Sequence, residues 1–251
     1  MKNKKKRVRE ITDYIKFVFP MLVLYILFFI FPLFQTIGYS FTDYNGINPR
    51  KEFTGLTNYV DVFQDKWFYN SMLFTGKSVI LMILLANVLG FLLALALNTK
   101  IKSRNILRAI VFCPFVFNNV TVGFIWQFLL GRFMTDLYPL TGWKVFNIGW
   151  LSDSSLVLYS VVFVKLWQSI GYFMVIYLAG LQLLPQDPLE AAVLDGCTGI
   201  KMIRYITIPL MKPTAFVCIF LAITESLNMF PLIMSLTNGG PGHASENISL
   251  Y

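Results

Sequence analysis

Charged residues are missing from long stretches of the chain, and this spacing predicts membrane-spanning helices. Three intervals contain no Asp, Glu, Lys or Arg, and two more contain one each, Lys165 and Glu225. About 20 helical residues cross the ~30 Å apolar core of a bilayer, and every interval is long enough to do so. The pattern predicts an all-α membrane protein with five transmembrane helices, near Phe17–Phe41, Met72–Asn98, Ile106–Leu130, Leu156–Leu184 and Pro213–Leu236.

The composition narrows the class of protein further. Of the 251 residues, 56% are hydrophobic and 14% are charged, whereas soluble domains have about 25% charged residues. This excludes a soluble enzyme, and 24 Phe with so few charges exclude a disordered chain. Three cysteines without a metal-ligand spacing and a single histidine, His243, predict neither a metal site nor a cofactor.

The net charge of +8 is concentrated on one side of the predicted spans. If the N-terminus is cytoplasmic, most of the 21 Lys and Arg residues fall in cytoplasmic segments, as the positive-inside rule requires. We therefore predict a basic cytoplasmic tail over 1–16 and a single transmembrane domain over 17–251. The basic run Lys2–Arg9 is interpreted as an anchor beside anionic lipid rather than as a nucleic-acid site.

The predicted cytoplasmic segment 185–212 is long for a connection between spans. Asp187-Pro188 is a strong helix start, because Asp caps a helix and Pro fits its first turn. Gly196 and Gly199 interrupt that helix, and a second helix is expected to end at Pro209. Two short helices bent at glycine either dock into a cleft on a cytoplasmic partner or lie on the membrane surface.

Residues inside this loop resemble the EAA motif, which is typical of permease subunits in binding-protein-dependent ABC importers. The matching residues are Glu190, Ala191, Ala192, Gly196, Ile206, Ile208 and Pro209. The motif usually has Leu in place of Ile208 and often Ala in place of Cys197, so an apolar or small side chain is kept at both positions. Four other segments resemble such permeases and occur in the expected order: Phe53–Tyr59, Trp167-Gln168, Ala179–Gln182 and Thr237–Pro241. The whole pattern is most similar to the carbohydrate-type, MalF/UgpA-like permeases.

The resemblance implies a MetI/MalF-like helical bundle in a bacterial-type cytoplasmic (inner) membrane. It implies three partners: a second permease forming a heterodimer, a cytoplasmic ABC ATPase dimer, and an extracytoplasmic solute-binding protein. The permease would not be an enzyme, because the partner subunits hydrolyse ATP. In agreement, Gly76-Lys77-Ser78 lacks the preceding glycine of a phosphate-binding loop, since that position is Ser71.

The resemblance also assigns roles to residues. Glu190 would pair with a basic residue in a cleft of the ATPase, Gly196 would permit the bend, and the two alanines would permit close packing. The ATPase-coupling set is Glu190, Ala191, Ala192, Asp195, Gly196, Ile206 and Pro209. The binding-protein contact would lie at Gly239, Gly240 and Pro241.

Polar residues at membrane depth are costly and therefore mark candidate functional positions. We predict that the substrate pathway is lined by Gln168, Ser169, Tyr172, Glu225 and Asn228, where aromatic faces and amide or carboxylate groups suit sugar hydroxyls. The alternative is that these groups satisfy one another across a helix interface. An ion pair between Lys165 and Glu225 is a further hypothesis.

Asn118 and Asn119 have two possible roles. They either line the same pathway or cap a helix break made by Pro114.

Three readings of the function stay open from the sequence. The first is an ABC importer permease for a sugar. The second keeps this class with a non-sugar cargo such as glycerol phosphate, a polyol or an amino acid, and the third is a secondary transporter or channel that needs no ATPase. Relatives of this class usually have six core spans, so we expect the last helix to be missing beyond 247–251 and the chain to be truncated.

Overall fold

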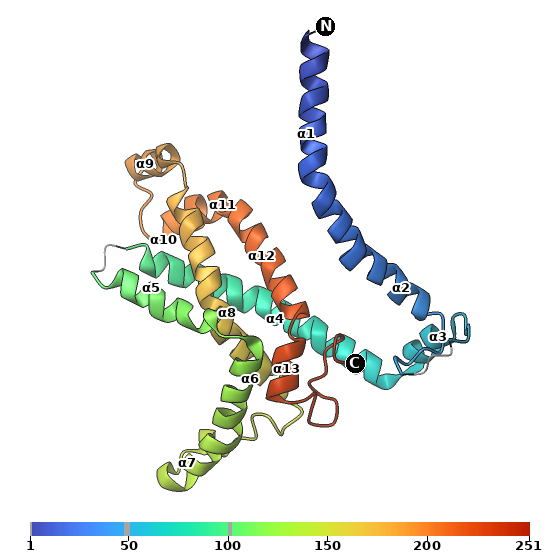
Figure 1. Ribbon diagram of the computed structural model, residues 1–251. Helices are drawn as coiled ribbons and strands as arrows, with labels where there is room; N and C mark the ends of the chain where they lie inside the picture. Colours follow the sequence, from blue (N-terminus) through green and yellow to red (C-terminus); the bar gives the residue numbers. More distant parts are fainter. Residues whose placement is uncertain (1, 48–50, 100–101) are drawn as a thin grey trace. The chain divides into compact units, whose positions relative to one another are not determined.

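The computed structural model describes residues 2–47, 51–99 and 102–251, and within these ranges the chain is helical (Figure 1). The one β pairing among the described residues is an isolated antiparallel bridge between Thr42 and Phe53. The chain divides into two compact units, Met1–Asp65 and Lys66–Tyr251. The single domain expected over 17–251 stays a prediction.

The first unit is built on one long helical segment. It consists of α1 (Lys2–Tyr25), a π-helical turn η1 (Ile26–Ile30) and α2 (Phe31–Tyr39). Residues Tyr14–Tyr39 are long and apolar enough to cross a membrane, and they bury no side chain within the unit. The basic run Lys2–Arg9 falls in the first turns of α1, and its side chains lie outside the described part of the chain.

A short segment held by polar hydrogen bonds follows α2 and leads to α3 (Thr57–Gln64). The Asn58 amide donates hydrogen bonds to the carbonyl oxygens of Ser40 (3.0 Å) and Thr42 (2.8 Å). Since Ser40 and Thr42 come directly after α2, these bonds hold the end of the span against the start of α3.

The second unit has two unbroken candidate spans, α4 (Lys66–Leu97) and α8 (Val157–Gln182). α4 packs against both α8 and α12 (Lys212–Leu227). Ala86, Gly90 and Ala94 are buried along one face of α4 at intervals of four residues. Gly90 admits close approach, because a Cβ there would lie 2.9 Å from the Cβ of Phe173 on α8. Small residues allow helices to pack in a membrane, where contact rather than water exclusion drives association.

The predicted third span is not one continuous helix. It consists of α5 (Arg104–Phe112), the 3₁₀ turn η2 (Cys113–Val116), α6 (Asn119–Gln127), the π turn η3 (Phe128–Phe133) and α7 (Met134–Thr141), followed by the 3₁₀ turn η4 (Lys144–Asn147). Its two halves are bent by 94° at Phe117 and Asn118, which are both extended. Pro114 has no N–H to continue the helix, and Asn118 Oδ1 accepts a hydrogen bond from the N–H of Val120 (2.9 Å) as the cap of α6.

The predicted fifth span, Pro213–Leu236, is also wrong as a single helix. α12 ends at Leu227, and the separate helix α13 (Phe230–Leu236) follows Asn228 and Met229. Pro231 in the first turn of α13 suits a new helix start, because its missing N–H has no partner to lose there.

The helix expected to end at Pro209 ends one residue later, at Leu210. α10 (Ile200–Met202), the π turn η5 (Ile203–Thr207) and α11 (Ile208–Leu210) are followed by a 71° bend into α12. The π turn η5 ends two residues before Pro209, and its wider hydrogen-bond pattern accommodates a residue that cannot donate a backbone hydrogen bond. Counting each bent pair as one span, the described chain has up to five spans, of which three are unbroken.

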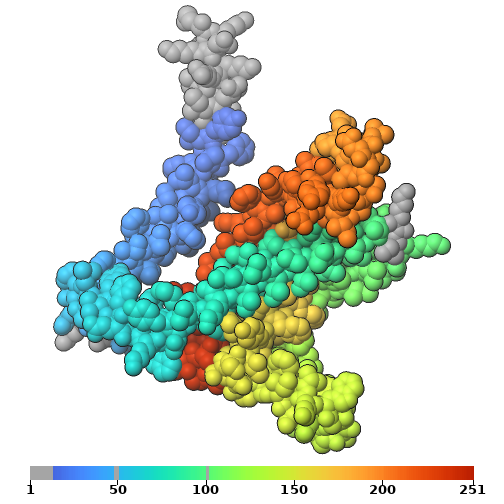
Figure 2. Space-filling model, turned by 180° about the vertical axis from the view of Figure 1, so that it is seen from behind, coloured from blue at the N-terminus to red at the C-terminus, as the bar shows by residue number. Residues whose placement is uncertain are grey.

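The connection after α8 and the connection after α6 lie at opposite ends of the second unit. Figure 2 shows the segment around α9 to α11 (orange) and the segment around α7 (yellow-green) far apart on the molecule. The helical segment α9 (Gln186–Leu194) projects from one end of α8 (Figure 1). The cavity described next lies between these two ends, on the polar part of α8.

Candidate functional site

An open cavity of about 390 Å³ lies where the two broken spans meet α8. Three segments far apart in sequence build its wall: the break before α6, one face of α8, and the end of α12 with the start of α13. The lining residues are Phe115, Phe117, Asn118, Asn119, Lys165, Gln168, Glu225 and Pro231. Non-helical backbone at membrane depth is tolerated where it is buried in protein or faces such a cavity.

Gln168 fastens α8 to the broken backbone of the third span. Its Nε2 donates a hydrogen bond to the carbonyl oxygen of Phe117 (2.9 Å). Phe117 is extended, so its carbonyl is outside the helical hydrogen-bond ladder and needs a partner. Gln168 lies three residues after Lys165 and therefore on the same face of α8.

Lys165 and Glu225 form an ion pair across the cavity wall, so the hypothesis of this pair is confirmed in the structure. Lys165 Nζ lies 2.5 Å from Glu225 Oε2, and the side chains are 3% and 30% exposed. Lys165 Nζ also donates to Asn119 Oδ1 at 3.4 Å. A lysine buried at this depth requires an opposite charge or acceptors nearby, and the structure supplies both.

Aromatic rings support the cavity from behind. Phe115 lines it, and the ring of Tyr172 stacks on Phe115 with centroids 4.6 Å apart and planes 1° apart. The close approach of α8 to this segment depends on Gly171. A Cβ at Gly171 would overlap the carbonyl oxygen of Val111 and the Cα of Phe112.

The five residues predicted to line the pathway divide into two groups. Gln168 and Glu225 line the cavity, whereas Ser169 is buried and its hydroxyl donates to the carbonyl of Lys165 within α8 (2.8 Å). Tyr172 lies behind Phe115, and Asn228 is exposed beyond the end of α12 and is not in the cavity wall.

Phe115, Phe117 and Pro231 also line the cavity, although their sequence context did not mark them as candidates. A proline followed by two asparagines inside an uncharged interval was the available sign of a break there. The two roles considered for the asparagines turn out to be compatible, since Asn118 caps α6 and also lines the cavity.

The loop carrying the EAA-like residues is a helical hairpin that projects from the bundle. α9 begins at Gln186, one residue before the predicted cap at Asp187. Glu190, Ala191 and Asp195 are exposed, while Ala192 is buried and α9 packs against η5. The chain then turns through Gly196 and Gly199, whose φ angles of +75° and +60° are in the left-handed region that glycine adopts without strain.

Large apolar side chains on this hairpin are unusually exposed. Leu194 is 88% exposed at the end of α9, and Leu183 and Ile200 are exposed on either side of it. Ile206 is half-buried and Pro209 is exposed on the returning segment. A projecting hairpin that combines exposed apolar residues with the exposed acid Glu190 has the chemistry of a docking surface.

The Gly-Gly-Pro loop lies at the other end of the unit and is held by its own polar groups. The Ser245 hydroxyl is fully buried, donates to the carbonyl of Gly240 (2.6 Å) and bonds the Thr237 hydroxyl (2.7 Å). Gly239 has φ +80° and is buried, whereas Gly240 and Pro241 are half-buried. The predicted binding-protein contact therefore lies on a braced loop with limited exposure.

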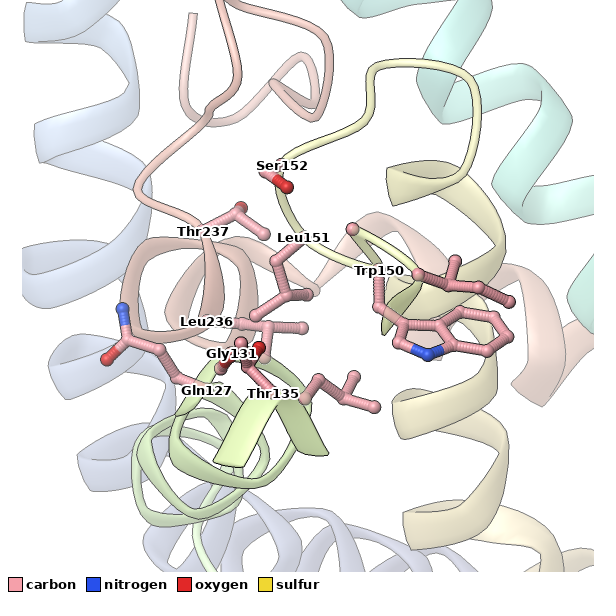
Figure 3. A pocket seen from close by; sticks show the side chains of 11 residues that line it. Gln127, Gly131, Thr135, Trp150, Leu151, Ser152, Leu236 and Thr237 are labelled. Carbon is pink, nitrogen blue, oxygen red and sulfur yellow. Dashed lines mark hydrogen bonds between the residues drawn. The ribbon is translucent and has the colours of Figure 1, made fainter. Parts of the chain in front are cut away.

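A second pocket of about 380 Å³ lies beside this loop (Figure 3). The Ser152 and Thr237 side chains both line it, Leu151 and Leu236 lie in the middle of the view, and the Trp150 ring points away from them. The adjoining turn is fixed by Asp153. Hydrogen bonds donated by the Ser155 hydroxyl (2.7 Å) and N–H (2.8 Å) hold the pKa of the Asp153 carboxyl below its usual value.

Comparisons with known proteins cover most of the chain. Residues 86–248 match the family described as "Binding-protein-dependent transport system inner membrane component". The chain is 35% identical to the probable starch degradation products transport system permease protein AmyD of Thermoanaerobacterium thermosulfurigenes, over 100% of this chain and 85% of that protein.

Two other relatives are named for different cargoes. The trehalose/maltose transport system permease protein MalF of Thermococcus litoralis is 32% identical, over 93% of this chain and 79% of that protein. The sn-glycerol-3-phosphate transport system permease protein UgpA of Brucella abortus is 30% identical, over 91% and 78%.

Solved structures share the fold. A chain of a bacterial ABC transporter involved in the import of the acidic polysaccharide alginate superposes with a TM-score of 0.79, covering 100% of this chain and 86% of that one, at 22% identity. At this identity the likeness concerns the arrangement of helices.

Proposed function

Because this chain belongs to the family of inner-membrane components of binding-protein-dependent transport systems, we propose that it is the permease subunit of an ABC importer that moves a sugar inward. The single observation that carries the proposal is the projecting α9 hairpin, which carries the EAA-like residues Glu190 and Gly196 and exposes Leu194 beside them. The relatives of this chain that are named for starch degradation products and for trehalose/maltose favour a sugar as the cargo. The relative named for glycerol 3-phosphate keeps a non-sugar cargo as the alternative.

In this proposal the hairpin docks into a cleft of a cytoplasmic ABC ATPase. Glu190 pairs with a basic residue of that cleft, and Leu194 buries its exposed side chain there. Gly196 provides the left-handed turn between the two arms, and the first arm, where Ala192 is buried, packs against η5. ATP is bound and hydrolysed by the partner, and the permease contributes motion rather than covalent chemistry.

The chain path supports such coupling, because both arms of the hairpin lead to the cavity. α8 carries Lys165 and runs directly into α9. From α9 the contacts pass through η5 and α11 to α12, which carries Glu225. A displacement of the hairpin would therefore move the two helices that hold the ion pair.

The remaining partners follow from the same proposal. A second permease, in a heterodimer, completes the pathway around the open cavity, and an extracytoplasmic solute-binding protein delivers cargo at Gly239–Pro241. The N-terminus and the α9 hairpin face the cytoplasm, since the basic residues gather on that side. The single transmembrane domain over 17–251 belongs to this proposal.

The test is co-purification of the ATPase and uptake by the reconstituted complex. The chain is co-expressed with the ATPase and permease subunits of its system, and radiolabelled maltose, trehalose and glycerol 3-phosphate are offered to proteoliposomes with its binding protein. We expect ATP-dependent uptake of a sugar, and loss of both ATPase recovery and uptake in the double variant Glu190→Arg, Leu194→Asp.

The matched control is Asp136→Arg, which reverses an exposed acid on α7 at the opposite end of the unit. It should leave ATPase recovery unchanged. Uptake that persists without ATP or ATPase would contradict the proposal and favour a secondary transporter or channel. ATP-dependent uptake restricted to glycerol 3-phosphate would keep the ABC class and overturn the sugar assignment.

A further inference from the structure

We propose that the Lys165–Glu225 ion pair makes the cavity selective for uncharged cargo, and that removing one partner shifts the preference toward cargo whose charge is opposite to that of the partner left behind. The inference rests on the proposed function, because it concerns what the same cavity accepts. It assigns to the pair a specificity-determining role in addition to joining α8 and α12.

The first argument is the charge of the cavity wall. Among its eight lining residues, Lys165 and Glu225 are the charged ones, and they neutralise each other at 2.5 Å. The other six are aromatic rings, amides and a proline. The wall therefore offers a cargo hydrogen-bonding groups and apolar faces but no net charge.

The second argument concerns the helix ends at the cavity. The positive N-terminal end of a helix can attract an anion through its free N–H groups. At α6 one of these is already occupied, because Asn118 Oδ1 accepts from the N–H of Val120. At α13 Pro231 has no N–H to offer. Both ends that reach the cavity are thus weakened as anion sites.

The third argument is the cost of admitting a charged cargo. Lys165 is 3% exposed, so an anion reaches its ammonium group only by displacing Glu225 or Asn119. Displacement leaves the Glu225 carboxylate without its partner in a partly buried site, which is unfavourable. A neutral polyhydroxyl cargo binds amide and aromatic groups without breaking the pair.

A purely structural link between α8 and α12 makes a different prediction. Loss of such a link would weaken all cargoes in the same proportion. Loss of a residue that selects cargo by charge instead changes the ratio of the affinities for charged and uncharged cargo. The direction of that change depends on which partner is removed.

The experiment uses the complex in lipid nanodiscs without its binding protein, so that delivery does not determine selectivity. Saturation-transfer NMR measures the binding of glucose, glucuronate and glucosamine, which share a ring and differ in charge, at a pH below the pKa of the amine. The wild type should favour glucose over both charged sugars. Glu225→Gln should raise the affinity for glucuronate relative to that for glucose by roughly threefold to tenfold. This is the effect of one unit charge acting through a partly hydrated cavity.

The reciprocal variant Lys165→Met should raise the affinity for glucosamine relative to that for glucose by a similar factor. The double variant Lys165→Met, Glu225→Gln and the swapped pair Lys165→Glu, Glu225→Lys should both retain the preference for glucose. They also keep the test decisive if a single variant fails to fold. Lys77→Met removes an exposed lysine from α4 outside the cavity wall and is the matched control, expected to change no ratio.

Ratios that stay constant across all variants would overturn the inference, and so would wild-type binding of glucuronate equal to that of glucose. Failure of the proposed function is distinguishable, because it shows as absent ATP-dependent uptake by the wild type whatever the binding ratios are.

Discussion

The cavity and the α9 hairpin are both candidate functional regions, yet they are constructed in opposite ways. The hairpin is one short stretch of sequence, and Glu190 and Asp195 are exposed, with no ion pair to any residue in the described part of the chain. The cavity is assembled from three distant segments, and its charged side chains bond one another. The acids of the hairpin thus remain available to a partner, as our docking proposal requires, whereas the two charges of the cavity wall are paired within the chain.

This contrast predicts how the two regions tolerate substitution. Changes around the cavity should alter the stability of the fold together with transport. Changes on the hairpin should alter coupling while leaving the membrane core intact.

The largest effect is expected for Gly171→Val. Because a Cβ at this position overlaps the backbone at Val111 and Phe112, α8 must move away from the segment that forms the cavity wall. The free energy of unfolding should fall by about 3 kcal/mol or more, measured as a lower midpoint of thermal unfolding in detergent. Gly76→Ala is the control, since no atom lies within 4 Å of its added Cβ, and it should be neutral or slightly stabilising. Equal midpoints for the two variants would show that the close approach is unnecessary.

Gly196→Val should have a smaller and more local effect. A β-branched residue at φ +75° costs about 1–2 kcal/mol, which the exposed hairpin can relieve by opening. We expect lower uptake with an unchanged unfolding midpoint of the membrane core. Gly196→Asn is the control, because Asn adopts this conformation more readily, and it should recover most of the uptake. A lowered midpoint in Gly196→Val would mean that the hairpin is part of the core.

Asn118→Ala tests the break in the third span. Loss of the cap to the N–H of Val120 should cost about 1 kcal/mol. The midpoint of thermal unfolding should fall accordingly, and Asn118→Ser, which retains a capping hydroxyl, should restore it. If both variants behave as the wild type, the bend is held by Pro114 and packing alone.

Glu190→Ala should have the smallest effect on stability, below about 0.5 kcal/mol, because the side chain is exposed. It should nevertheless reduce ATP-dependent uptake by about tenfold or more, since its partner in the ATPase would be left unpaired. Asp136→Ala, an exposed acid at the opposite end, is the matched control and should leave uptake unchanged. An unaffected rate in Glu190→Ala would contradict the docking role of the hairpin.

The sequence by itself determined which intervals are long and apolar enough to cross a membrane and which segment projects from the helical bundle. An uncharged interval of about 20 residues or more can be recognised from neighbouring positions in the sequence. A helix that crosses a bilayer needs such an interval however the helices pack against one another. The hairpin was also accessible from the sequence, because its helix start, its glycines and Glu190 lie within about 20 consecutive residues. Such features depend on neighbours in the chain rather than on neighbours in space.

Only the tertiary structure decided how the spans are broken and which polar groups meet. The extended residues Phe117 and Asn118 are stable at membrane depth because Gln168, 51 residues away, donates to the Phe117 carbonyl. The same packing brings Lys165 to Glu225 and leaves Asn228 outside the cavity. Helical spacing alone placed Glu225 and Asn228 on one face, but the chain leaves the helix at Leu227, so that face ends before Asn228. A polar side chain in lipid needs a partner, and which partner it finds is a property of the folded arrangement.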